Sequence, residues 1–115
     1  MARFAFDHLE DHSLLAGTRS LQIRDRLTTA LLVARIGEID SRRLAERMGY
    51  ASTLAWCIEE LRLSEDEAWR RIRAARFGRN YPELFQALAD GRLHLTAVNL
   101  IGPTCHAIAD QWPKL

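Results

Sequence analysis

No segment of this sequence alternates apolar and polar residues over the length of a strand with turn residues on both sides. Apolar residues instead recur at spacings of three and four, which is the period of an amphipathic helix. The breaks between these runs are short and contain glycine, proline or a side chain able to cap a helix. We therefore expect an all-α fold, built as a compact array of six or seven helices.

The size and composition of the chain fit one such array. Its 115 residues can bury a single modest core, and 48% hydrophobic with 27% charged residues is ordinary for a globular protein. No apolar run approaches the roughly 18 to 20 residues that span a bilayer, and the first residues do not resemble a signal peptide. We expect a cytoplasmic protein with no membrane partner, in which Cys57 and Cys105 are reduced thiols.

The first third of the chain predicts a lead-in and a long helix. A short helical segment over 8–16 is expected to stop at Gly17, so that residues 1–17 form the lead-in. Thr18 is the expected N-cap of a long helix that ends near Asp40. Its buried face is expected at Ile23, Leu27, Leu31, Ala34 and Ile36.

Three further helices are expected to form a helix-turn-helix-like centre. A short helix over 42–48 is closed by Gly49, and Ser52 caps a second over 53–61. The third, over 65–77, follows after a tight joint. This order of short helix, turn, helix and basic helix is typical of DNA-binding folds.

The strongest local signal begins the third of these helices. Ser64 and Glu67 have the spacing of a capping box, in which each side chain accepts a hydrogen bond from the other residue's backbone N–H. Gly78 is the expected left-handed residue after its last turn.

Two more helices complete the expected array. Pro82 begins one that Gly91 ends, and Thr96 caps a last short helix. The helical domain is expected to span residues 18–103, and residues 104–115 form an irregular or truncated tail.

Basic residues concentrate on the third helix of the centre. Between Ala68 and Tyr81 the chain has five arginines and no acidic residue. These are Arg70, Arg71, Arg73, Arg76 and Arg79. Arginine binds phosphate through a planar fork, so this run predicts a DNA-binding face. The alternative is a solvated surface on which the arginines pair with nearby acidic side chains, such as those of Glu59, Glu60, Glu65 and Asp66.

Nothing in the sequence predicts catalysis. His8 and His12 have the four-residue spacing of two zinc ligands on one helical face, but a third and fourth ligand are missing. No glycine-rich phosphate loop, nucleophile elbow or paired-carboxylate motif is present. We therefore expect no enzyme activity, no catalytic residue, no metal site and no cofactor.

Residues 42 to 101 resemble the helical N-terminal region of bacterial HNH-endonuclease proteins. The matching residues are Arg42-Arg43-Leu44, Gly49-Tyr50-Ala51-Ser52, Trp56-Cys57, Glu60-Leu61, Leu63-Ser64-Glu65-Asp66-Glu67-Ala68, Arg71-Ile72, Ala74-Ala75-Arg76, Pro82-Glu83-Leu84 and Asp90-Gly91-Arg92-Leu93-His94-Leu95-Thr96-Ala97. In such proteins a C-terminal HNH module, with two histidines and an asparagine on a ββα-metal element, is the nuclease. The resemblance therefore implies a non-catalytic module, truncated before the HNH part, because the sequence beyond Pro103 does not match.

The expected function is DNA binding or DNA positioning through the arginine run, without nuclease activity of its own. Two alternatives stay open: a protein–protein scaffold or oligomerisation module, and an inactive truncated remnant of an HNH endonuclease. A continuous arginine surface favours the DNA function, whereas exposed apolar patches favour the scaffold. The oligomeric state is left open.

Overall fold

The computed structural model describes residues 3–101, and within them the chain forms six helices and no strand. The helices are α1 (Asp11–Ser41), α2 (Leu44–Arg47), α3 (Thr53–Glu60), α4 (Glu65–Asn80), α5 (Glu83–Asp90) and α6 (Leu95–Ile101). The predicted all-α array is confirmed, and the three helices of its expected centre follow one another as α2, α3 and α4. No helix in the described part is both long and apolar enough to cross a bilayer.

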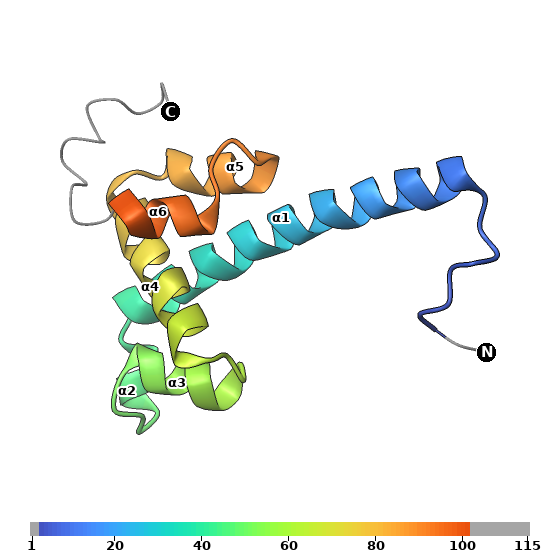
Figure 1. The fold of residues 1–115 in the computed structure, drawn as a ribbon. Helices are drawn as coiled ribbons and strands as arrows, with labels where there is room; N and C mark the ends of the chain where they lie inside the picture. The colour runs from blue at the N-terminus through green and yellow to red at the C-terminus, as the bar shows by residue number, and fades with distance from the viewer. Residues whose placement is uncertain (1–2, 102–115) are drawn as a thin grey trace.

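The compact part of the molecule is organised around α4. The second half of α1 packs against α4 and α5, α6 packs on α4, and α2 and α3 lie at the end of the molecule where α4 begins (Figure 1). The first half of α1 extends away from all the other helices (Figure 1). We call residues 11–28, which precede the buried part of this helix, the α1 arm.

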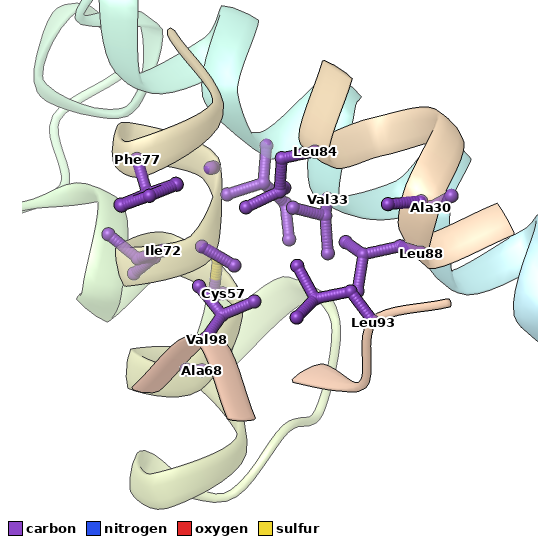
Figure 2. Close-up of a cluster of buried hydrophobic side chains, with 14 residues drawn as sticks. Ala30, Val33, Cys57, Ala68, Ile72, Phe77, Leu84, Leu88, Leu93 and Val98 are labelled. Carbon is purple, nitrogen blue, oxygen red and sulfur yellow. The ribbon is translucent and has the colours of Figure 1, made fainter. Parts of the chain in front are cut away.

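One cluster of buried side chains joins these helices. Its fully buried members include Val33 of α1, Ile72 of α4 and Leu84 of α5, all labelled in Figure 2. Cys57 of α3 and Val98 of α6 belong to the same cluster, so α3 and α6 are joined to it as well. Burying each large aliphatic side chain contributes about 1.5–3 kcal/mol, so this cluster is the main stabilising element of the fold.

Two glycines allow the helices to approach closely. A Cβ atom at Gly37 of α1 would lie 3.3 Å from the Cβ of Ala75 in α4. A Cβ atom at Gly78 of α4 would overlap the ring of Phe85 in α5. The expectation that Gly78 ends its helix in a left-handed conformation is therefore wrong: α4 continues to Asn80, and Gly78 makes room for the neighbouring helix.

The expected helix break at Gly17 is also wrong. α1 begins at Asp11 and continues without interruption to Ser41, so the boundary expected after residue 17 lies inside a helix. Thr18 is not an N-cap, because its hydroxyl donates a hydrogen bond to the backbone oxygen of Leu14 at 2.7 Å. A glycine inside a helix costs only about 1 kcal/mol relative to alanine, which does not suffice to stop a helix that continues on both sides.

Smaller differences concern helix ends. Helix α2 begins only after Arg43, which adopts a left-handed conformation with φ of 55°. Pro82 immediately precedes α5, and Gly91 ends that helix at φ of 83° as expected. Helix α6 begins at Leu95, so Thr96 lies within the helix and is not its cap. The tail expected over 104–115 lies outside the described residues.

Candidate interaction surfaces

The start of α4 forms as the sequence predicts. The backbone N–H of Glu67 donates to the Ser64 hydroxyl oxygen at 3.1 Å, and the backbone N–H of Ser64 donates to the Glu67 carboxylate at 3.4 Å. Both hydrogen bonds of the capping box are therefore present. The capping box therefore fixes the residue at which α4, the helix with the arginines, begins.

Two of those arginines bind a carboxylate of α1. Arg76 donates to Asp40 through Nε (3.0 Å to Oδ2) and Nη2 (3.1 Å to Oδ1), and Arg79 donates through Nη2 (3.0 Å to Oδ2). The hydroxyl of Thr53, at the start of α3, donates to the same carboxylate at 2.8 Å. We call these four residues the Asp40 clamp; it connects α1, α3 and α4.

The electrostatics of the clamp follow from this geometry. The Asp40 side chain is only 12% exposed, yet the carboxylate is fully supplied with donors. The hydrogen bond from Arg76 lowers the pKa of Asp40 most, burial opposes the change, and the Thr53 hydroxyl lowers it further, so that the pKa falls from 3.8 to about 2. The ionised carboxylate is therefore the form that the fold stabilises.

The five arginines of the run are not equally exposed: Arg73, Arg76 and Arg79 are exposed, whereas Arg70 and Arg71 are half-buried. Arg76 and Arg79 are half-exposed but hold Asp40, and Arg71 is half-buried with its Nη1 donating to the Glu67 backbone oxygen at 3.1 Å. Among the ion pairs of residues 3–101, the acidic partner of the run is Asp40, not the neighbouring acids expected. Only geometry could reveal this pairing, because Asp40 lies 36 residues before Arg76 in the sequence.

The other two arginines of the run, Arg73 and Arg70, have fewer side-chain partners. The Arg73 side chain is exposed, and its guanidinium lies 5.4 Å from the centre of the Trp69 ring. Arg76 also lies over this ring, at 6.0 Å. Arg70 is half-buried, and its backbone oxygen accepts a hydrogen bond from Asn99 at 3.1 Å. The part of the run that is available to bind an anion is therefore Arg73 with the Trp69 ring beneath it, and we call this pair the Trp69 patch.

The histidines and cysteines form no site in the described part of the chain. His8 and His12 are both exposed, and the nearest carboxylate to His12 is that of Glu10, at 3.5 Å. No group of three potential metal ligands occurs among residues 3–101. Cys57 is a buried free thiol, as predicted, and its burial raises the pKa of the thiol. Cys105 lies outside the described residues.

The face of α1 that packs on the protein agrees only in part with the face that the sequence predicts. Ile36 is buried as expected, and Ala34 is half-buried. Ile23, Leu27 and Leu31 were expected in the core, but they are 49–60% exposed. The buried residues are Ala30, Val33 and Ile36, which are spaced by three and face α4 and α5. The sequence of α1 contains more than one apolar stripe, and its periodicity does not indicate which of them a neighbouring helix covers.

The exposed aliphatic side chains of α1 are numerous and large. Six of them are 40–63% exposed, and we call them the aliphatic set: Leu14, Leu15, Leu21, Ile23, Leu27 and Leu31. At about 100° per residue they point to more than one side of the helix. A helix that is apolar on several sides is normally buried by other helices. The α1 arm thus has the apolar residues that are typical of a helix packed by its neighbours, but in this structure those residues are exposed.

Local interactions give the arm little support as an isolated helix. No side chain caps its N-terminus, and Gly17 lies within it. Among the ion pairs of residues 3–101, only the contact between His12 and Glu10 involves the arm. Most of the stability of a helix in a protein comes from the packing of its apolar face, and the aliphatic side chains of the arm are exposed. A partner that covers the aliphatic set would stabilise the arm as well as remove apolar surface from water.

Several of the residues that resemble HNH-endonuclease proteins have an identifiable role in the fold. Ser52 and Ser64 cap helices, Gly91 adopts a left-handed conformation, and Ala75 lies at the crossing of α1 and α4. These roles account for the residue types by the needs of a helical fold. No family model, curated protein or solved structure matches the chain. The relationship to HNH-endonuclease proteins therefore stays a prediction.

Proposed function

We propose that this chain is a helical oligomerisation module that joins copies of itself through the α1 arm. The observation that supports this proposal is the extension of the arm away from the compact part (Figure 1), with five members of the aliphatic set exposed along it and Leu31 exposed just beyond it. The sequence left a DNA-binding module and a scaffold or oligomerisation module as alternatives. Exposed apolar surface favours the second, and the binding of Arg76 and Arg79 to Asp40 weakens the case for the first.

The size of the exposed surface is sufficient for a specific interface. At 40–63% exposure, the six side chains of the aliphatic set leave on the order of 500 Å² of apolar surface in water on each copy. Typical stable interfaces bury about 800 Å² on each partner, of which rather more than half is apolar. In total area the aliphatic set and the polar side chains beside it approach an ordinary dimer interface. Because the set points to more than one side of the helix, a partner has to surround the arm to bury all six side chains.

Sedimentation velocity over protein concentrations of about 1 to 200 µM tests this proposal, because weak dimers dissociate within that range. We expect the unchanged chain to associate and the Leu21→Glu/Ile23→Glu variant to remain monomeric. Both side chains are at least 60% exposed, so the variant should fold normally. Met48→Glu is the matched control, since Met48 is 64% exposed but lies outside the arm, and it should associate like the parent. A parent that is monomeric at every concentration would overturn the proposal.

A second candidate function is weak DNA binding through the Trp69 patch. The supporting observation is that the exposed Arg73 lies over the Trp69 ring, an arrangement that can present its guanidinium group to phosphate while the ring provides apolar contact. We propose fewer phosphate contacts than the five expected from the sequence, because Arg76 and Arg79 hold Asp40. A measurement of the affinity for duplex DNA as a function of salt concentration tests this function separately.

The relationship to HNH-endonuclease proteins is also proposed, with the chain as a counterpart of their non-catalytic helical region or as a remnant of one. The resemblance of residues 42 to 101 supports it. The nucleotide sequence downstream of the codon for Leu115 provides the test. An HNH-encoding segment there would support the relationship, and an unrelated sequence would contradict it.

A further inference from the structure

We infer that an arginine-bordered apolar stripe of α1 docks on the acidic joint between α3 and α4 of a second copy of this chain. The stripe consists of Ile23, Leu27 and Leu31, and we call it the α1 stripe. The receiving surface is formed by residues 59–66, which we call the α3–α4 joint. This inference rests on the proposed oligomerisation function and names the surface of the partner that covers half of the aliphatic set.

The three residues of the α1 stripe lie on one side of the helix. They are spaced by four, so that at about 100° per residue they fall within an arc of about 80°. All three side chains are 49–60% exposed. They are therefore members of the aliphatic set that one partner surface can cover together, without surrounding the helix.

Arginines border the α1 stripe on both edges. On the same helical wheel Arg19 lies about 80° to one side of the centre of the stripe, and Arg24 and Arg35 lie about 60° and 80° to the other. The three arginines are exposed and take part in none of the ion pairs formed among residues 3–101. Asp25, the one acidic residue in the sequence from 12 to 37, lies on the opposite side of the helix. The α1 stripe is therefore apolar surface with positive charge on its borders.

The α3–α4 joint has the opposite charge. Its acidic residues are Glu59 and Glu60 at the end of α3 and Glu65 and Asp66 at the start of α4, and Arg62 is its one basic residue. All four acidic side chains are exposed, and none takes part in an ion pair within the described part of the chain. These carboxylates are therefore available to the arginines of another molecule.

The joint also contains apolar residues. In the sequence, Leu61 and Leu63 separate the acidic residues at the end of α3 from those at the start of α4. Both leucines are half-buried and pack against the core cluster, so part of each side chain stays at the surface. Contact with the α1 stripe would pair opposite charges around these leucines and remove apolar surface of both copies from water.

A second copy supplies the surface that one copy cannot offer to itself. The α3–α4 joint lies at the end of the compact part where α4 begins, whereas α1 runs past α5 and projects to another side (Figure 1). The joint of one copy therefore does not reach its own α1 stripe. Because each copy has both surfaces, two copies can make the contact twice, each placing its α1 stripe on the joint of the other.

Exchange of charges between the two surfaces tests the inference by sedimentation velocity. The arm variant is Arg19→Glu/Arg24→Glu, and the joint variant is Glu59→Arg/Glu65→Arg. Each should weaken association by about tenfold or more, because like charges then face each other, whereas a chain with all four changes should associate nearly as the parent does. Glu83→Arg is the matched control, since Glu83 is an exposed acidic residue in the first turn of α5, outside the joint, and it should associate like the parent.

A photo-crosslinking residue at position 20 locates the contact directly. Ser20 is exposed and lies about 20° from the centre of the α1 stripe, so its replacement leaves the stripe and both charged surfaces intact. Mass spectrometry of the crosslinked dimer should find the crosslink within residues 59–66 of the other copy. Because this chain keeps every charged residue, its result holds even if a charge variant folds poorly.

Three results would overturn the docking on the joint and leave the oligomerisation function in place. They are a joint variant that associates like the parent, a chain with all four changes that does not recover, and a crosslink from position 20 to α1 of the other copy. A parent that is monomeric at every concentration would overturn both.

Discussion

The replacement Asp40→Asn removes one charge from the Asp40 clamp and nearly preserves the shape of the side chain. The pKa of Asp40 is about 2 in the folded protein against an ordinary 3.8, a difference that corresponds to about 2 kcal/mol in favour of the ionised form. Arg76 and Arg79 are 50% and 46% exposed, so solvent screens part of this interaction. We expect the variant to lose about 1–2 kcal/mol of unfolding free energy at pH 7.

The pH dependence of this effect has a definite sign. Because folding lowers the pKa of Asp40, its contribution to stability is complete above pH 3.8 and disappears as the pH falls from 3.8 toward 2. The variant has no carboxylate at this position and lacks that part of the acid sensitivity. The difference in stability between parent and variant should therefore be largest near neutral pH and small near pH 2.

Urea unfolding followed by circular dichroism at pH 7, 4, 3 and 2 measures this difference. Glu38→Gln is the matched control, because its ion pair with Arg42 lies on the same helix but is about 60% exposed on both sides. Such surface pairs contribute about 0.5 kcal/mol or less, so the control should nearly superimpose on the parent. Equal midpoints for parent and Asp40→Asn at pH 7, or an undiminished difference at pH 2, would refute the role of the clamp.

Further predictions concern α4 and the DNA function. Ser64→Ala should lower the unfolding free energy by about 0.5–2 kcal/mol, and an unchanged urea midpoint would mean that the capping box contributes nothing. Gly78→Ala should cost about 1–3 kcal/mol, because the added methyl group displaces the Phe85 ring; a variant as stable as the parent would contradict this close approach. Changing Arg70 and Arg73 to glutamine should flatten the slope of log affinity against log salt by about 2 in duplex binding, and an unchanged slope would exclude them as phosphate contacts. Incubation of the purified chain with duplex DNA and magnesium, manganese, zinc or nickel should leave the DNA intact, and cleavage by the chain itself would contradict the expected absence of a catalytic site.

Local signals predicted the helical architecture well. The capping side chains of Ser52 and Ser64 and the left-handed Gly91 were all located from sequence. These features depend on hydrogen bonds and backbone angles within a few residues, so the neighbouring sequence contains the information that defines them. Gly17 and Gly78 were misinterpreted for the opposite reason. A glycine can end a helix, but it can also lie within one, and the sequence nearby does not distinguish the two cases.

The candidate surfaces depended on tertiary structure. The arginine run was visible in the sequence, but the binding of two of its members to a carboxylate was not. The carboxylate that binds Arg76 and Arg79 belongs to a residue more than 35 positions away, in another helix. The identity of the buried stripe on α1 was likewise undetermined. Periodicity identifies the apolar sides of a helix, and only the packing of α4 and α5 against Val33 and Ile36 decides which side is buried and leaves the aliphatic set in water.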